Sequence, residues 1–232
     1  MPFASLRNVE HIRVVVNDLD NAVATWKIWL EALHEDLNTV YIDQEIFEAL
    51  HQAIVDSGTT SGLWANHYQR LYVSKQTMAI RRIARGKKGE IALTTLLADI
   101  RRKAQELTVD WYRKLVTARP GFGAVQIDHF ADSFTSEWCN GGDHLDVTIV
   151  DGDRRTLGNE VASVRDWADT TIAHLIENAQ PAALTWGQLR ASFDSVANLL
   201  NRYEDLLTGR IWNNPPTFAG DWRDPFRKRL IY

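Results

Sequence analysis

Residue types that bind metal ions or move protons are concentrated in one stretch in the middle of the chain. Between positions 129 and 146 they are His129, Asp132, Cys139, Asp143, His144 and Asp146. A zinc site needs three or four ligands that converge on one point, and a spacing of three residues brings only His129 and Asp132 to one face of a helix. The other interpretation is a polar loop above a helix. We expect no bound metal and no cofactor.

Two further histidines lie in stretches with the apolar spacing of a helix. His67 falls between Trp64 and Leu71 on one face, so we expect a hydrogen-bonded histidine in the core. His174 follows a long apolar stripe, and periodicity alone predicts a structural histidine near a helix end. The alternative for His174 is a group that donates and accepts protons, because histidine titrates near neutral pH.

Motifs that define a mechanism are missing from the sequence. There is no glycine-rich phosphate loop, no H-E-x-x-H pair of metal ligands and no G-x-S-x-G nucleophile turn. Cys139 is the single cysteine, which excludes an internal disulfide and any site built from several cysteines.

Basic residues are concentrated in residues 70–119, although the whole chain has a net charge of −4. That segment carries +9, whereas residues 1–69 carry −7 and residues 120–232 carry −6. This distribution predicts an anion-binding face. Its most clustered cations are Arg81, Arg82, Arg85, Lys87 and Lys88. Two other interpretations stay open: the cluster caps the negative end of a helix, or it pairs with the acidic segments and leaves no net patch.

Apolar spacing predicts helices along almost the whole chain. From Ile12 to Leu37 the apolar residues recur in alternating steps of four and three, which places them on one narrow stripe of a long helix. Such a stripe lies in a groove between helices or against a second copy of the chain, so we expect a homodimer. A separate helix over Gln44–Val55 is predicted to stop at Ser57 and Gly58.

Further helices are predicted as far as Gly209. The first ends before Gly86, with a buried face made of Trp64, His67, Leu71, Ser74 and Met78. Others are expected over residues 89–106, 109–116 and 125–138, then from 157 to just before Pro181, with Leu157, Val161, Val164, Ala168, Thr171 or Ile172, and Leu175 buried. The last opens with Thr185-x-x-Gln188, a capping box. Residues 145–150 alternate loosely, which is typical of a short extended piece, but no partner strand is apparent.

The predicted architecture is an all-α bundle of about six to eight helices in a single domain. Residues 1–58 form an N-terminal helical extension, 59–208 the core, and 209–232 a tail whose aromatic residues pack back on the bundle. No apolar run approaches the ~18 residues of a membrane span, and the N-terminus lacks the apolar stretch of a secretory signal. We expect a cytoplasmic protein without a membrane partner.

Several stretches taken together resemble the HEPN superfamily, and within it the AbiU-type abortive-infection proteins of bacteria. Asp169-x-x-x-Ala173-His174 is similar to the D-K-x-x-A-H signature of the superfamily. Other stretches agree in order with the AbiU-type group. Its first helices are similar to residues 75–82 and 92–100. The start of its final helix is similar to residues 184–189, and its aromatic tail is similar to residues 220–226. The likeness covers about residues 60–226.

The resemblance implies a helical bundle, often dimeric, and in many members a metal-independent ribonuclease of phage-defence or toxin–antitoxin systems. There, a histidine and an arginine four to six residues apart on one helix move protons at the 2′-OH and the leaving 5′-oxygen and neutralise the phosphate. The resemblance makes His174 the acid/base or base-contacting group, Asp169 the residue that orients it, and Arg165 the nearest arginine on its helix. The expected arginine positions are occupied by Trp167, Ala168 and Asp169. Arg165 falls nine residues before His174, about 900° of rotation and so on the opposite side of the helix.

Three functions remain open. The first is a HEPN-like bundle without nuclease activity that binds RNA, a nucleotide or a protein partner, with the basic cluster on the phosphates. The second is a ribonuclease that uses His174 with an arginine from another helix or subunit. The third is a structural or oligomerising protein with no nucleic-acid role, which would lack the steep loss of binding with salt that phosphate contacts produce. We favour the first.

Overall fold

The computed structural model describes residues 18–56, 58, 62–87, 89–173 and 183–209. Its elements are α1 (Asp18–Asp56), α2 (Leu63–Ala84), α3 (Leu93–Arg102), the 3-10 turn η1 (Ala104–Glu106), α4 (Val109–Thr117), α5 (Ala124–Trp138), α6 (Val147–Glu160), α7 (Ala162–Trp167), the π-helical segment η2 (Ala168–Ala173) and α8 (Trp186–Thr208). The predicted all-α bundle is confirmed. In the described residues the strand-like pairing is limited to an isolated bridge between Thr108 and His144.

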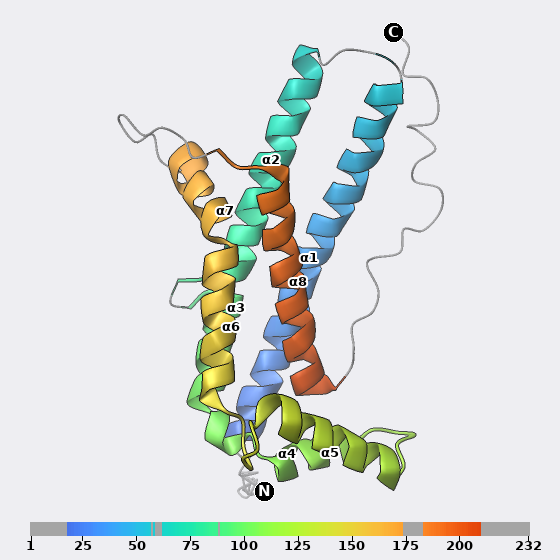
Figure 1. Cartoon of the computed structure of the whole chain (residues 1–232), viewed down its shortest axis with the longest axis vertical. Coiled ribbons are helices and arrows are strands. Elements are labelled where there is room, and N and C mark those ends of the chain that lie inside the picture. Colours follow the sequence, from blue (N-terminus) through green and yellow to red (C-terminus); the bar gives the residue numbers. More distant parts are fainter. Residues whose placement is uncertain (1–17, 57, 59–61, 88, 174–182, 210–232) are drawn as a thin grey trace, which may run out of the picture.

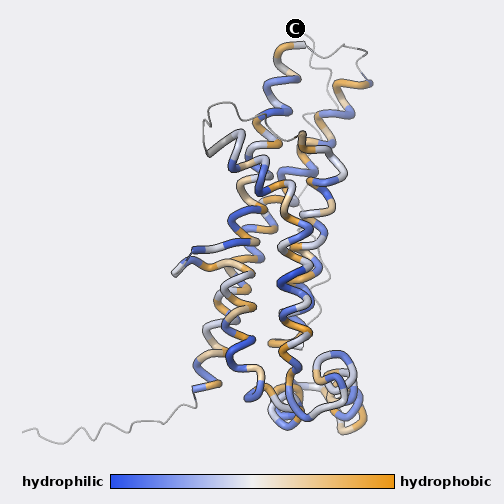
Figure 2. The backbone as a smooth tube through the Cα atoms, turned by 60° about the vertical axis from the view of Figure 1, so that its left-hand side comes forward, coloured by the Kyte–Doolittle hydropathy of each residue, from blue (hydrophilic) through white to orange (hydrophobic). Residues whose placement is uncertain are grey.

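The long helices run side by side along the molecule (Figure 1). α1, α2 and α8 pack on one another, α6 packs on α3 and α8, and α7 packs on α2 and α8. α4 and α5 form a hairpin at the end where α1 begins, whereas α1 and α2 extend past the start of α8 at the other end (Figure 1). One apolar cluster connects helices α1 to α8. Figure 2 shows the alternation of apolar and polar residues along these helices that such packing requires.

α1 is one continuous helix of 39 residues, so the prediction of a separate helix over Gln44–Val55 is wrong. The predicted stripe is buried as far as Leu37 and continues to Leu50. No glycine or proline divides the two segments, and packing on α2 and α8 stabilises the stretch between them. The helix stops just before Gly58, whose φ of +66° fits the predicted end signal. Residues 12–17 of the predicted helix lie outside the described residues.

The face of α2 that was predicted to be buried is largely exposed to solvent. His67, Leu71 and Met78 are exposed, and Ser74 is half-buried. The prediction that His67 is a core histidine is therefore wrong. The side chain of Trp64 lies outside what the structure describes.

The buried face of α2 contains polar residues whose hydrogen bonds are satisfied. Its fully buried members are Gln76, Thr77, Ile80, Ile83 and Ala84. Gln76 Nε2 donates to the Val40 carbonyl at 3.2 Å, and Thr77 Oγ1 donates to the Val73 carbonyl at 2.6 Å. Because these bonds offset the cost of burying polar groups, the face packs on α1, α7 and α8 although its sequence resembles a solvent-facing surface.

The helix predicted from residue 157 toward Pro181 begins earlier and is interrupted. It starts at Val147, where the Asp146 carboxylate accepts a hydrogen bond from the Thr148 N–H at 2.8 Å. Of the short extended piece considered for residues 145–150, residues 147–150 are therefore helical. The α-helix breaks at Val161 and becomes π-helical from Ala168. The stripe residues that the structure confirms as buried are Leu157, Val161, Val164 and Ala168. The side chain of Ile172 and residues 174–182, with Leu175 and Pro181, lie outside the described residues.

α8 agrees with the prediction at both ends. Thr185 Oγ1 accepts from the Gln188 N–H at 3.2 Å, and Gln188 Oε1 accepts from the Thr185 N–H at 2.9 Å, which is the predicted capping box. Gly209 ends the helix with a φ of +57°. The predicted aromatic tail, residues 210–232, lies outside the described residues. None of the described helices combines the length and apolar character needed to cross a membrane.

Candidate functional site

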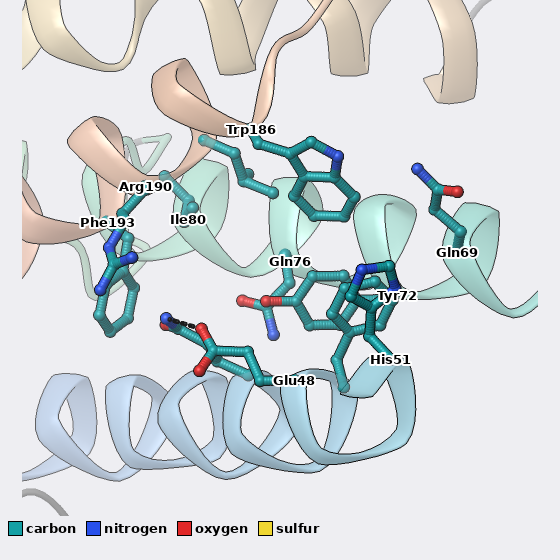
Figure 3. Close-up of a pocket in the computed structure, with 12 residues that line it drawn as sticks. Glu48, His51, Gln69, Tyr72, Gln76, Ile80, Trp186, Arg190 and Phe193 are labelled. Atoms are coloured by element: carbon teal, nitrogen blue, oxygen red, sulfur yellow. Dashed lines mark hydrogen bonds between the residues drawn. The ribbon is translucent and has the colours of Figure 1, made fainter. Parts of the chain in front are cut away.

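A cleft of about 300 Å³ lies between α1, α2 and the first turns of α8. α1 contributes Gln44, Phe47, Glu48 and His51, α2 contributes Gln69, Tyr72, Gln76 and Ile80, and α8 contributes Trp186, Leu189, Arg190 and Phe193. Figure 3 shows side chains from the three helices directed toward the space between them. Glu48, His51, Arg190 and Trp186 are exposed, so the cleft is accessible from solvent.

Stacked aromatic rings form one wall of this cleft. The ring centroids of Phe47 and Tyr72 are 4.0 Å apart, with 10° between the ring planes. The ring centroids of Phe47 and Trp186 are 5.3 Å apart, with 29° between the ring planes. Tyr68 extends the stack at 5.8 Å from Phe47. Trp186 is 46% exposed, and an exposed indole beside stacked rings offers a surface for another planar ring.

Polar groups surround this aromatic wall. Gln44 Nε2 donates to Glu48 Oε1 at 3.0 Å, which holds the carboxylate beside the cleft. Burial, followed by the negative charges of Glu48 and Asp43, raises the pKa of Tyr72 well above its ordinary value. Tyr72 therefore stays protonated at neutral pH. It can form hydrogen bonds but does not supply a phenolate nucleophile.

The cleft offers ring faces, amide groups, one carboxylate and one guanidinium, a combination suited to binding. Only part of the lining of this cleft could have been predicted from the sequence. Phe47 and His51 on α1, and Tyr68 and Tyr72 on α2, each lie four residues apart and so share a helical face. That spacing could have indicated two aromatic faces, but no local signal showed that they meet Trp186.

The structure describes two of the three residues predicted to be catalytic, Arg165 and Asp169, and each contacts a different charged partner. Both Arg165 Nε and Arg165 Nη2 bond to Asp166 Oδ1, at 2.9 and 2.8 Å. Asp169 forms an ion pair with Arg81 of α2, with 2.7 Å between Nη2 and Oδ1. His174 lies outside the described residues, directly after η2. The structure thus places an arginine from another helix beside the helix that leads to His174.

Some cations of the predicted phosphate-binding cluster form ion pairs with carboxylates, and others do not. Arg81 pairs with Asp169, and Arg82 Nη2 lies 2.6 Å from Asp36 Oδ1. Both arginines lie in the last turn of α2, where Arg85 forms the C-cap. In the described part of the chain the exposed side chains of Arg85 and Lys87 form no ion pair, and Lys88 lies outside it.

Other cations of segment 70–119 also pair with carboxylates. The pairs are Lys75 with Asp43, Arg101 with Asp151, Arg102 with Asp99, Lys103 with Asp18 and Glu106, and Arg113 with Asp128. Most of these partners belong to the acidic segments on either side. The observed pairing favours the interpretation in which the segment's charge is neutralised rather than displayed as one anion-binding face.

The residues of metal-ligand type have structural contacts of their own. Cys139 is buried, and burial, with the charges of Asp143 and Asp146, raises the pKa of its thiol to about 11. Asp143 Oδ1 lies 2.6 Å from His144 Nδ1, which lowers the pKa of Asp143. His129 and Asp132 are exposed on α5. Among the described residues no group of three or more histidine, cysteine, aspartate or glutamate side chains is arranged to hold a metal ion.

Comparisons of the chain with family models, with curated proteins and with solved structures found no match. The likeness to HEPN proteins therefore stays a prediction based on residues 60–226. The aromatic cleft is the feature of the described structure with the clearest binding chemistry. Two stretches that carry the likeness contribute to its lining: residues 75–82 supply Gln76 and Ile80, and residues 184–189 supply Trp186 and Leu189.

Proposed function

We propose that the protein is a non-catalytic, HEPN-like helical bundle that binds a nucleotide, free or within RNA, by taking its base into the cleft between α1, α2 and α8. The observation that carries the proposal is the stack of Phe47, Tyr72 and the half-exposed Trp186. Every nucleobase has a π-face that stacks on such rings. A bacterial defence or toxin–antitoxin setting is the biological context that the HEPN resemblance implies.

The size and charge of the cleft support binding through the base rather than through the phosphates. A volume of about 300 Å³ is at the lower end of ligand pockets, which suits one ring system. Arg190 is the one arginine or lysine among the residues that line it. Because few phosphates are contacted, the affinity for a nucleotide is expected to fall only slightly with added salt.

Replacing Trp186 with alanine is expected to weaken nucleotide binding about 5- to 150-fold, because each stacked base is worth about 1–3 kcal/mol. Isothermal titration calorimetry of the full chain with the four ribonucleoside monophosphates measures this loss. Val125→Ala, which removes an 82% exposed side chain on α5, is the control and leaves the affinity unchanged. Absence of binding by the wild type at millimolar nucleotide would refute the proposed function and favour a protein partner or a structural role.

A ribonuclease is the second candidate, because two observations favour it. Arg81 of α2 is paired with Asp169, five residues before His174. An arginine supplied by a neighbouring helix would replace the one missing from positions 167–169. π-Helical segments such as η2 are also frequent at functional sites.

The ribonuclease candidate predicts that wild-type protein cleaves labelled RNA in EDTA and that His174→Ala and Arg81→Ala each reduce the rate at least about 100-fold. Denaturing gels of bulk tRNA and messenger RNA measure the cleavage. Arg102→Ala, which removes an exposed arginine of α3, is the matched control and keeps the wild-type rate. Intact RNA with the wild type would rule out this candidate.

A further inference from the structure

We propose that Glu48 makes the cleft selective for guanine among the nucleobases. This inference rests on the base-binding function proposed above and adds the identity of the base. Glu48 is the one carboxylate among the residues that line the cleft.

Glu48 is held in a defined position on α1. It follows Phe47 in the chain and lies one helical turn after Gln44, whose amide nitrogen donates to Glu48 Oε1 at 3.0 Å. Figure 3 shows the Glu48 side chain running along α1, with its carboxylate on the Phe193 side of Gln76. The side chain is one of those that line the cleft.

A carboxylate accepts hydrogen bonds and donates none, so it favours a ring edge that carries neighbouring donors. Guanine has two, the N1–H and the exocyclic N2 amine. Adenine and cytosine present an amine beside an acceptor nitrogen, and uracil presents one N–H between two carbonyl oxygens. The acceptors of these three bases would repel the carboxylate, whereas guanine forms two charge-assisted bonds, which are about twice as strong as neutral ones.

Arg190 supplies the complementary charge from α8. It lines the same cleft as Glu48, and in the described structure the two residues form no ion pair with each other. A guanidinium matches the O6 and N7 acceptors of guanine, which lie on a different edge of the ring from N1 and N2. A carboxylate from one helix and a guanidinium from another therefore match two edges of the same base.

Calorimetric titration of the full chain with the 5′-monophosphates of guanosine, inosine and adenosine tests this inference. Guanosine monophosphate is expected to bind about 5- to 150-fold more tightly than adenosine monophosphate, the discrimination typical of one bidentate contact. Inosine monophosphate keeps the N1–H but lacks the N2 amine, so its affinity is expected to lie between the two. Equal binding of all three would overturn guanine selectivity and leave base binding intact, whereas no binding of any would overturn the proposed function.

Glu48→Gln tests the role assigned to this side chain. The amide keeps the size of the carboxylate but removes its charge and one acceptor, so the guanine preference is expected to fall to less than about threefold. Glu35→Gln, at an exposed position of the same helix outside the cleft, is the control and keeps the wild-type preference. Circular dichroism is the check that both variants are folded. A guanine preference that survives in Glu48→Gln would refute the inference.

Discussion

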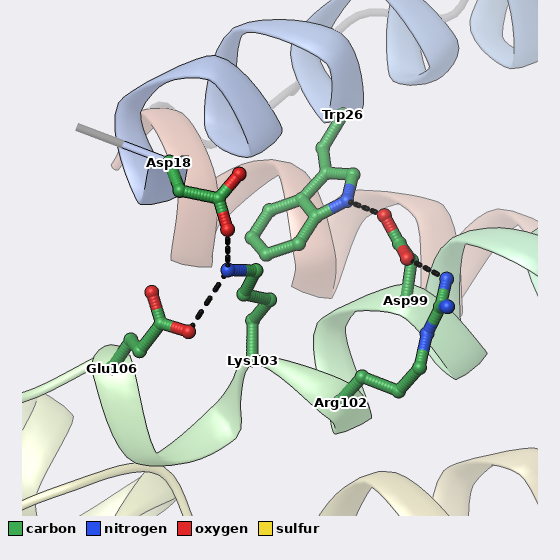
Figure 4. A network of polar contacts seen from close by, with 6 residues as sticks. All are labelled: Asp18, Trp26, Asp99, Arg102, Lys103 and Glu106. Carbon is green, nitrogen blue, oxygen red and sulfur yellow. Dashed lines mark hydrogen bonds and ion pairs between the residues drawn. The ribbon is translucent and has the colours of Figure 1, made fainter. Parts of the chain in front are cut away.

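Replacing Trp26 with alanine is expected to lower the free energy of unfolding by about 3–5 kcal/mol. Trp26 is fully buried in the apolar cluster, so the loss of its ring leaves a cavity. The change also removes a hydrogen bond between α1 and α3, because Trp26 Nε1 donates to Asp99 Oδ2 at 2.8 Å. Figure 4 shows Asp99 between this indole and Arg102, so the carboxylate would lose one of its two partners.

Urea denaturation followed by circular dichroism measures the effect of Trp26→Ala. Ile28→Ala is the matched control, because Ile28 lies two residues further along α1 and is 62% exposed. Its replacement is expected to change the free energy of unfolding by less than about 0.5 kcal/mol. Similar small losses for the two variants would contradict the position of Trp26 in the core.

Replacing Glu204 with alanine is expected to lower the free energy of unfolding by about 3 kcal/mol. A hydrogen bond that involves a charged group contributes about 1.5–3 kcal/mol, and this value lies at the upper end of that range. Glu204 Oε2 lies 2.5 Å from His34 Nε2, and the side chains of these residues are 18% and 9% exposed. The pair connects α1 with α8. The substitution removes the carboxylate that contacts the buried imidazole of His34.

The double replacement His34→Leu with Glu204→Leu separates the contribution of the polar contact to stability from the contribution of side-chain packing. Two leucines fill the space without a buried polar group, so the double variant is expected to be more stable than Glu204→Ala. Asp194→Ala, at an exposed position of α8, is the control and is expected to change the free energy of unfolding by less than about 0.5 kcal/mol. Equal unfolding curves for Glu204→Ala and this control would show that the pair contributes nothing.

Local signals were sufficient where a helix begins or ends. Gly58 after α1, the capping box at Thr185 and Gly209 after α8 all act within a few residues of the chain. Each satisfies or terminates backbone hydrogen bonds of its own helix, and each was recognised from the sequence. The helical stripe of α8 was also predicted, because Leu189, Val196 and other apolar residues dominate its buried face.

The buried face of α2 shows where periodicity was insufficient. Gln76 and Thr77 look like solvent-facing residues, yet both are buried. Gln76 donates to the Val40 carbonyl of α1, whereas Thr77 donates to the Val73 carbonyl of its own helix. Leu71, at 55% exposure, looks like a core residue and is not. Which face of a helix is buried depends on the partners available from other helices as well as on the helix's own residues.

The sequence was enough to define an all-α fold, the ends of several helices and the lack of familiar catalytic motifs, because these depend on neighbouring residues. Only the tertiary structure joined Phe47, Tyr72 and Trp186 into one wall and placed Arg81 beside Asp169. Residues that are many turns apart in the chain meet through the packing of three or more helices. Their distances are set by the shape of the whole core, which no local pattern encodes.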